Sequence, residues 1–278
     1  MEKTPISFGR LPLVEKILLL FAAVCGLCSC SSEPGIGIVA HRGYWNCGEG
    51  GMSHNSIASL KAACEHGFWG TEFDVNLTAD NRLLVYHDGE IDGKKICEHN
   101  ISDFSDFRLP NGEPIPTLDE YLDVAVKYPK TRLVLELKPH EDDAQQRSAV
   151  AGVVSSLKAH GLFTPDRVMF ISFSLNECRL LAEAAPGFSV QYLATDNDVE
   201  TLKRNHVNGI DMHYKAFLDN PEWNEDARAN GFSINVWTVD KEDALRRCID
   251  ARVDLITTNN PELLRSVLAE KGVRELRN

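Results

Sequence analysis

The sequence of 278 residues lacks the features of several whole classes of protein. Its 29 Lys and Arg residues are scattered among 41 Asp and Glu residues, for a net charge of -12, whereas a nucleic-acid-binding surface needs clustered positive charge. It has no low-complexity stretch and no long linker, and 43% of its residues are hydrophobic, which excludes a disordered or fibrous chain. We therefore expect a folded protein with no nucleic-acid partner.

The N-terminal apolar run is too short to span a bilayer. Residues 17–27 carry no charge and follow Lys3, Arg10 and Lys16, which is typical of a secretory signal, since a transmembrane helix needs about 20 apolar residues. The run ends in Leu27-Cys28-Ser29-Cys30, which resembles a bacterial lipobox with Cys30 as the lipidated residue. This predicts a signal peptide over residues 1–29, a tether over 30–35 and an extracytoplasmic lipoprotein, periplasmic or on the outer membrane if the cell has two membranes. An ordinary signal peptide or an uncleaved anchor is the alternative.

Five cysteines follow Cys30, and no two of them are spaced C-x-x-C. Neither a zinc site nor thioredoxin-like chemistry is therefore indicated. An odd number leaves at least one thiol unpaired, and we expect mostly buried small side chains.

Short apolar runs alternate with amphipathic segments along the rest of the chain, a pattern typical of a mainly parallel sheet covered by helices. The predicted strands are residues 36–40, 70–75, 82–87, 132–137, 167–172, 189–193, 207–212, 232–239 and 253–257. The clearest predicted helices are residues 56–66, 118–128, 145–160, 175–184 and 241–251. A closed α/β barrel needs eight strands, so one of the nine is an edge hairpin or a misassigned loop.

Residues 89–116 have no clear period and are rich in Asp, Gly and Pro. We expect them to form an inserted excursion after the third predicted strand. It ends at Thr117, where Thr117-Leu118-Asp119-Glu120 predicts a capping box at the start of a helix.

Polar residues collect at the ends of the predicted strands in the first half of the chain. Side chains alternate between the two faces of a strand, so Glu72 and Asp74 share a face, as do Glu136 and Lys138. In a TIM barrel the C-terminal ends of the strands meet at the catalytic end. The charged groups expected to meet there are His41, Arg42, Glu72, Asp74, His87, Glu136 and Lys138.

The order of these motifs resembles the signature of the glycerophosphodiester phosphodiesterase family. The matching segments are His41-Arg42-Gly43, Glu72-Phe73-Asp74-Val75, His87-Asp88, Leu135-Glu136-Leu137-Lys138, Ile171-Ser172-Phe173, Asn235-Val236-Trp237-Thr238-Val239 and Thr258-Asn259-Asn260-Pro261. The resemblance covers residues 36–264 and implies a TIM (β/α)8 barrel over residues 36–278, with the insertion at about 89–116.

The resemblance also implies roles for individual residues. One divalent metal is expected on Glu72, Asp74 and Glu136, and the two catalytic histidines are expected to be His41 and His87. The phosphate-contacting residues are expected to be Arg42 and Lys138, although Lys138 has the alternative role of a structural partner of Glu136.

Two segments depart from the family pattern. The usual E-N-T is His54-Asn55-Ser56 here, and the usual T-D-x-P is Thr258-Asn259-Asn260-Pro261. Each departure replaces an acid, so we expect a contact to substrate, or to the residues behind the site, to differ. His54 is either a substrate contact or merely the residue before Asn55, which we predict to be the N-cap of the first helix.

The residue types suit hydrolysis of a phosphodiester. Three carboxylates favour Ca²⁺ or Mg²⁺, which together with Arg42 would neutralise the non-bridging oxygens. Two histidines can deprotonate the attacking group and protonate the leaving oxygen. In this family the attacker is thought to be the glycerol 2-hydroxyl, giving a cyclic phosphate, but direct attack by water would use the same residues.

Other polar and aromatic residues receive weaker assignments. Trp237 is expected at the barrel mouth against a glycerol group, with a core position as the alternative. His213 follows a predicted strand but matches no motif. The remaining histidines are expected at the surface: His66, His99, His140, His160 and His206.

The sequence thus predicts hydrolysis of glycerophosphodiesters to sn-glycerol 3-phosphate and an alcohol. One alternative is a related phosphodiesterase or phospholipase acting on lysophospholipid, phosphoinositol or phosphosaccharide diesters. Another is a non-catalytic lipoprotein that binds anionic ligands, but such a protein has no need of two positioned imidazoles.

Overall fold

The computed structural model describes residues 35–278. The predicted signal peptide over 1–29, the lipidated Cys30 and the tether residues before Gly35 lie outside the described residues. Within 35–278, no helix combines the length and the apolar character needed to cross a membrane.

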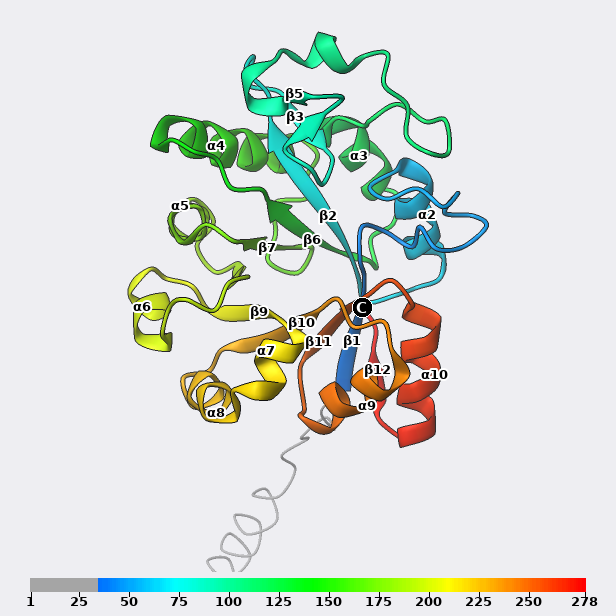
Figure 1. The fold of residues 1–278 in the computed structure, drawn as a ribbon, viewed down its shortest axis with the longest axis vertical. Coiled ribbons are helices and arrows are strands. Elements are labelled where there is room, and N and C mark those ends of the chain that lie inside the picture. Colours follow the sequence, from blue (N-terminus) through cyan, green and yellow to red (C-terminus); the bar gives the residue numbers. More distant parts are fainter. Residues whose placement is uncertain (1–34) are drawn as a thin grey trace, which may run out of the picture. The chain divides into compact units, whose positions relative to one another are not determined.

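Eight parallel strands close into a barrel, as predicted (Figure 1). The barrel strands are β1 (Gly35–Ala40), β2 (Gly70–Leu77), β6 (Arg132–Leu137), β7 (Val168–Ser172), β8 (Ser189–Tyr192), β9 (Gly209–His213), β10 (Ser233–Trp237) and β11 (Leu255–Thr258). The barrel closes because β1 pairs with β11 on one side and with β2 on the other.

Two further strands extend the sheet outside the closed barrel. β3 (Leu83–Val85) corresponds to the third predicted strand, residues 82–87, and it pairs antiparallel with β2 as an edge strand. It is therefore the surplus one of the nine predicted strands. β12 (Arg274–Leu276) pairs parallel with β1 and was not predicted.

Helices surround the barrel (Figure 1). They are α2 (Ile57–Glu65), α3 (Leu118–Ala125), α4 (Asp143–Ala159), α5 (Leu175–Ala184), α6 (Val199–Arg204), α7 (Tyr214–Asp219), α8 (Pro221–Ala229), α9 (Glu242–Asp250) and α10 (Pro261–Lys271). The main hydrophobic core lies between these helices and the outer faces of the strands. A smaller cluster, which includes Val39, Val134 and Ile171, fills part of the barrel interior.

The excursion between β3 and α3 has a small core of its own. It contains β4 (Glu90–Ile91), β5 (Lys94–Lys95), η1 (Ile96–Glu98) and η2 (Ile101–Phe104), packed around buried residues such as Ile96 and Phe104. The capping box at its end forms as predicted: the Glu120 backbone N–H donates to the Thr117 hydroxyl, and the Thr117 N–H donates to the Glu120 carboxylate.

The five cysteines of the described residues are free thiols. Cys178 and Cys248 are buried and the other three are half-buried, so the expectation of mostly buried side chains holds for only two of them.

A cavity lies at each end of the barrel. The C-terminal ends of the strands surround a cavity of about 140 Å³, which we call the mouth. The N-terminal ends surround a wider hollow of about 440 Å³, which we call the bottom hollow.

Candidate active site at the barrel mouth

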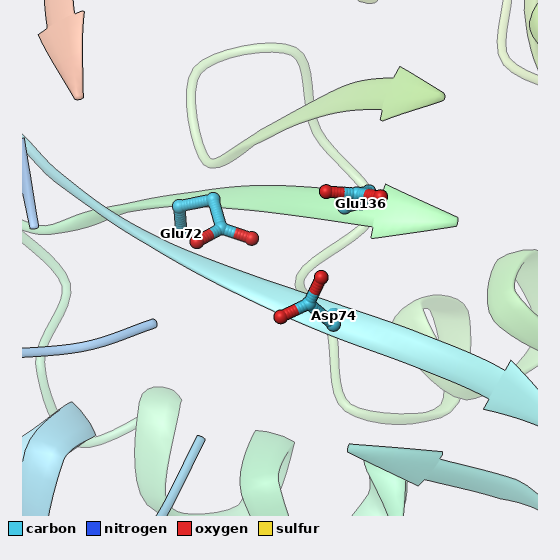
Figure 2. Close-up of side chains that lie close together, drawn as sticks. All are labelled: Glu72, Asp74 and Glu136. Carbon is cyan, nitrogen blue, oxygen red and sulfur yellow. The ribbon is translucent and has the colours of Figure 1, made fainter. Parts of the chain in front are cut away.

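Three carboxylates from two neighbouring strands converge at the mouth (Figure 2). Glu72 and Asp74 lie two residues apart on β2, and Asp74 is paired in register with Glu136 on β6. One oxygen from each lies within 4.8 Å of the others. All three side chains are buried, so the strand alternation seen in the sequence does place these acids on one interior face.

Crowding of these acids shifts their protonation. Burial, together with Asp74 and Glu136, raises the pKa of Glu72 well above its usual value. Burial and Asp74 raise the pKa of Glu136 to about 7. Burial also raises the pKa of Asp74, but Lys138, His87 and Arg42 outweigh it and hold that pKa below its usual value. The cluster therefore resists full ionisation unless positive charge joins it.

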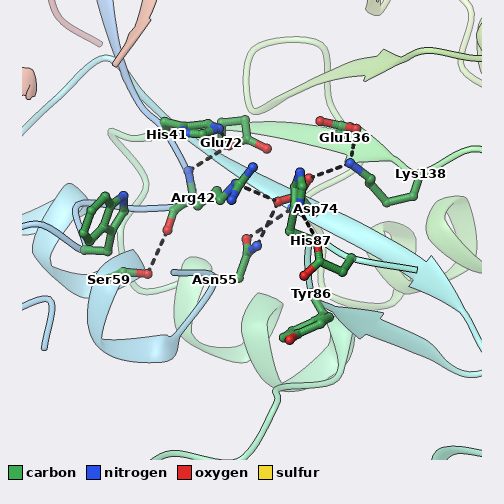
Figure 3. Close-up of polar contacts among 12 residues, drawn as sticks. His41, Arg42, Asn55, Ser59, Glu72, Asp74, Tyr86, His87, Glu136 and Lys138 are labelled. Carbon is green, nitrogen blue, oxygen red and sulfur yellow. Dashed lines mark hydrogen bonds and ion pairs between the residues drawn. The ribbon is translucent and has the colours of Figure 1, made fainter. Parts of the chain in front are cut away.

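These residues fit a hard divalent cation. Three buried carboxylates within 4.8 Å of one another supply oxygen ligands, and buried like charges are stabilised by a metal ion. Figure 3 shows the basic groups of Arg42 and Lys138 beside the cluster, where they bring part of the balancing charge.

Arg42 is held beside the acids by an unusual backbone. Its φ of 56° lies in the left-handed region, and its backbone N–H donates to Glu72 Oε2 at 2.7 Å. Its Nε lies 3.6 Å from Asp74 Oδ2. Gly43 follows at φ 79°, and a Cβ there would lie 2.3 Å from Ser59 Oγ, so the turn after β1 requires glycine.

Lys138 pairs with two of the three acids. Its Nζ lies 2.7 Å from Glu136 Oε1 and 3.3 Å from Asp74 Oδ1, and it also lines the mouth cavity. The geometry is therefore compatible with both of the roles expected for Lys138.

Asn259 orients the ring of His41. Asn259 Oδ1 lies 2.9 Å from His41 Nδ1 and 2.9 Å from Trp45 Nε1. An indole N–H can only donate, so the Asn259 atom facing both rings is the carbonyl oxygen, and His41 Nδ1 must carry the hydrogen. The unprotonated nitrogen of a neutral His41 is then Nε2, which lies 3.9 Å from Glu72 Oε2. Burial and the charge of Arg42 lower the pKa of His41 to about 4.

Asp240 in turn fixes the amide of Asn259. The Asn259 Nδ2 donates to Asp240 Oδ2 at 2.8 Å, and the Asn259 backbone N–H donates to Asp240 Oδ1 at 2.8 Å. Since Asp240 accepts from the amide nitrogen, the carbonyl oxygen of Asn259 must point toward His41. Asp240 was not singled out from the sequence, because it belongs to none of the family motifs.

His87 lies beside Asp74, between Arg42 and Lys138 (Figure 3). It follows β3, lines the mouth cavity and is partly exposed. Its Nδ1 lies 2.7 Å from Asp88 Oδ1. The preceding residue is anchored, since the Tyr86 N–H donates to the backbone oxygen of Asp74 at 3.0 Å.

The far wall of the mouth, built by β7 to β10, is mostly apolar. Phe173, Leu193 and Trp237 line it, which confirms the mouth position expected for Trp237. The indole of Trp237 donates to the backbone oxygen of Asp211 at 2.9 Å. Asp211 itself lines the cavity and was missed in the sequence, although its alternation with Gly209 and His213 marks it as an interior polar residue.

Two sequence expectations about residues near the mouth are wrong. The N-cap of α2 is Ser56 and not Asn55. Asn55 adopts φ 54°, donates its side-chain amide to Asp74 Oδ2 at 2.8 Å and accepts the Asp74 backbone N–H at 3.2 Å.

His140 is the second wrong expectation, because it is buried rather than at the surface. Its Nε2 accepts the Leu77 N–H, so its Nδ1 donates to Glu177 Oε1 at 2.8 Å. This bond ties the loop after β6, which carries Lys138, to α5.

His54 lies at the rim of the mouth. It is exposed and packs edge-on against Trp45, with 4.1 Å between the ring centroids. Among the described residues its side chain has no hydrogen-bond partner, and it does not line the cavity.

Comparison with known proteins agrees with this geometry. A family model described as the glycerophosphoryl diester phosphodiesterase family matches residues 41–263. The chain belongs to this family. A glycerophosphodiester phosphodiesterase of Caldanaerobacter subterraneus subsp. tengcongensis is 28% identical to it over 251 residues, which cover 84% of this chain and 98% of that protein. A Bacillus subtilis glycerophosphodiester phosphodiesterase is 26% identical over 91% of this chain and 98% of its own.

Solved structures share the fold of this family member. A glycerophosphodiester phosphodiesterase from Parabacteroides distasonis superposes with a TM-score of 0.82 at 38% identity, covering 87% of this chain and 100% of its own. A phosphodiesterase from Oleispira antarctica superposes with a TM-score of 0.72 at 24% identity, covering 84% of this chain and 97% of its own.

The two departures from the family pattern have different structural consequences. At the first, His54 packs against Trp45 and does not bond the acids, whereas Asn55 donates to Asp74. At the second, Asn259 contacts His41 through a neutral amide, and the acid of this network is Asp240, one step further from the ring.

Proposed function

We propose that this chain hydrolyses glycerophosphodiesters to sn-glycerol 3-phosphate and an alcohol, with one divalent cation. The observation that carries the proposal is the convergence, at one barrel mouth, of three buried carboxylates with His41, His87, Arg42 and Lys138. Its family and the names of its relatives support the same reaction. The Oleispira antarctica structure is a complex with the product sn-glycerol 3-phosphate.

The phosphate group is proposed to bind between the acid cluster and the two basic side chains. Glu72, Asp74 and Glu136 would hold the cation, which when bound supplies positive charge to the non-bridging oxygens of the diester. Ca²⁺ and Mg²⁺ are the candidates, because every ligand is a hard carboxylate oxygen. Arg42 and Lys138 would orient the same oxygens by charge-assisted hydrogen bonds.

His41 is proposed as the general base. Its Nδ1 hydrogen is committed to Asn259, and its lowered pKa leaves it neutral, so Nε2 is free to accept a proton from the attacking hydroxyl or water. His87 is proposed as the general acid that protonates the leaving alcohol. Its place at the partly exposed side of the cavity suits an alcohol that departs to solvent.

The location of the protein is proposed from the N-terminal sequence. We expect Cys30 to carry a lipid that holds the protein at an extracytoplasmic membrane surface. β1 begins at Gly35, at the N-terminal ends of the strands, whereas the mouth lies at their C-terminal ends. A short tether between Cys30 and Gly35 would leave the mouth open to soluble diesters. Mass spectrometry of the mature N-terminus tests the lipid, and an intact residue 1 would overturn it.

The activity is tested with glycerophosphocholine and glycerophosphoethanolamine. The expected result is release of sn-glycerol 3-phosphate that stops when a chelator is added and returns when Ca²⁺ or Mg²⁺ is restored. Binding without turnover would favour a ligand-binding lipoprotein. Turnover confined to lysophospholipid, phosphoinositol or phosphosaccharide diesters would assign the mouth to a different substrate.

A further inference from the structure

A buried carboxyl group in the mouth has no part in the chemistry described above. Asp211 lies on β9, across the cavity from β2, and is 1% exposed. It lines the same cavity as His41, Glu72 and Glu136. Its Oδ1 is buried and, among the described residues, has no hydrogen-bond partner.

The polar side chain on the neighbouring strand does not come within hydrogen-bond distance of Asp211 Oδ1. Asn235 is paired with Asp211 in register on β10, and its Nδ2 is also buried without a hydrogen-bond partner. The Asn235 side-chain oxygen is engaged with the hydroxyl of Thr257, 3.3 Å away. A buried carboxyl oxygen with no partner costs free energy, which a polar ligand group in the cavity would recover.

The remaining walls restrict what that ligand group can be. The basic groups and the acid cluster stand on the β1, β2 and β6 side, so the phosphate belongs there. The opposite side offers Phe173, Leu193 and Trp237, and within the described part of the chain Asp211 is its one carboxyl group. A small group with carbon atoms and a hydroxyl suits such a wall, because the carbons pack on the apolar side chains while the hydroxyl bonds the carboxyl.

We propose that Asp211 binds a hydroxyl of the substrate's glycerol group and so selects glycerol phosphates from other phosphate esters. This inference rests on the proposed function. Asp211 is a binding residue, whereas proton transfer remains with His41 and His87. Trp237 holds it in place through the hydrogen bond from its indole to the Asp211 backbone oxygen, 2.9 Å long.

The test compares two ligands that differ only in hydroxyl groups, sn-glycerol 3-phosphate and n-propyl phosphate. Calorimetry on the full chain with saturating Mg²⁺ gives both affinities. The wild type should bind sn-glycerol 3-phosphate at least about tenfold more tightly, the effect of one well-placed buried hydrogen bond. Equal affinities would overturn the inference without any substitution, so the test does not depend on how a variant folds.

Substitution then assigns the preference to the residue. Asp211→Asn should weaken binding of sn-glycerol 3-phosphate about tenfold and leave n-propyl phosphate within twofold. The matched control is Gln191→Met, since Gln191 is an equally buried interior polar residue that lines the bottom hollow instead. A preference unchanged in Asp211→Asn, or lost equally in the control, contradicts the proposal.

Two further outcomes distinguish a glycerol-binding role of Asp211 from recognition of the quaternary ammonium and from failure of the proposed function. If Asp211→Asn slows glycerophosphocholine and p-nitrophenyl phosphocholine alike but spares glycerophosphoethanolamine, Asp211 recognises the quaternary ammonium and the inference is wrong. If the wild type prefers sn-glycerol 3-phosphate in calorimetry yet hydrolyses no glycerophosphodiester, the proposed function fails while the glycerol site stands.

Discussion

The mouth and the bottom hollow are cavities at opposite ends of one barrel, and they differ in volume and in the charged residues that line them. The bottom hollow is the larger, at about 440 Å³ against about 140 Å³. Yet Arg132 is the one charged residue among residues 35–278 that lines it, and its guanidinium stacks on Trp69 at 5.1 Å. The mouth brings together four acids, two histidines and two bases when Asp74 is counted with the residues that line the cavity. The comparison shows that converging charge, and not volume, marks the site.

The largest expected effect comes from removing the histidines at the mouth. His41→Ala and His87→Ala should each lower kcat by about 10²–10⁴, the usual value of one acid or base. Release of sn-glycerol 3-phosphate is the measurement, and Gln191→Met at the bottom hollow should keep the wild-type rate. Full activity in both histidine variants would contradict the proposed roles of His41 and His87 as general base and general acid.

Loss of one carboxylate should disable the cation site. Asp74→Asn removes a ligand charge from a cluster whose oxygens lie within 4.8 Å of one another, and we expect Mg²⁺ or Ca²⁺ affinity to fall by about 100-fold or more. Titration calorimetry with the cation alone measures this. Asp254→Asn, at the N-terminal end of β11, is the matched control, and equal cation binding in both variants would contradict the assignment.

The Asp240 network should affect turnover more than binding. Every partner of the Asp240 carboxylate is a donor, so Asp240→Asn forces two donors together and favours rotation of the Asn259 amide. His41 would then lose its acceptor, and we expect kcat to fall about tenfold with KM little changed.

The tautomer of the His41 imidazole shows whether a lower kcat in Asp240→Asn comes from a misoriented His41 or from a general loss of structure. Nitrogen NMR of His41 should report the Nδ1-protonated form in the wild type and a mixture in Asp240→Asn. A fall in kcat with an unchanged tautomer would reject the orienting role.

The pH dependence of cation binding provides a smaller effect. Burial and Asp74 raise the pKa of Glu136 to about 7 in the cation-free protein, so below pH 7 the cation must displace a proton. Affinity should therefore weaken as pH falls from 8 to 5.5, by at most about tenfold per pH unit for each proton displaced. Calorimetry in buffers of different ionisation enthalpy counts the protons released when the cation binds. Release of no protons below pH 7 would contradict a cation site that includes Glu136.

The smallest effect is expected at the bottom hollow. Gln191 Nε2 donates to Ser233 Oγ at 2.8 Å, while its Oε1 is buried without a hydrogen-bond partner among the described residues. Gln191→Met removes both the hydrogen bond and the unpartnered oxygen, so the free energy of unfolding should change by about 1 kcal/mol or less. Thermal unfolding measures this. A large loss of activity in this variant would break the distinction between the two ends.

Sequence reasoning located the mouth because its main residues obey simple local rules. Alternation of side chains on β2 and β6 places Glu72, Asp74 and Glu136 on one face of the sheet. A closed barrel needs only eight of the nine predicted strands, and β3 is the one that lies at the edge. The order of the family motifs then gave each of these residues an expected role, which side-chain alternation alone does not do.

The missed features depend on contacts that sequence spacing does not encode. Asn55 was predicted as a cap from its place before a helix, but its left-handed backbone turns the amide toward Asp74, 19 residues away. Asp240 follows β10 and Asn259 follows β11, and the two residues meet because these neighbouring parallel strands end side by side. Asp211 faces the mouth only because the barrel closes, which brings β9 opposite β2.

The measurement that tests the central claim most directly is anomalous diffraction from crystals soaked with Mn²⁺ and sn-glycerol 3-phosphate. The account predicts one manganese peak at about 2.0–2.6 Å from carboxylate oxygens of Glu72, Asp74 and Glu136, with the phosphate on it and the glycerol directed toward Asp211. Manganese elsewhere, or the ligand in the bottom hollow, would contradict it.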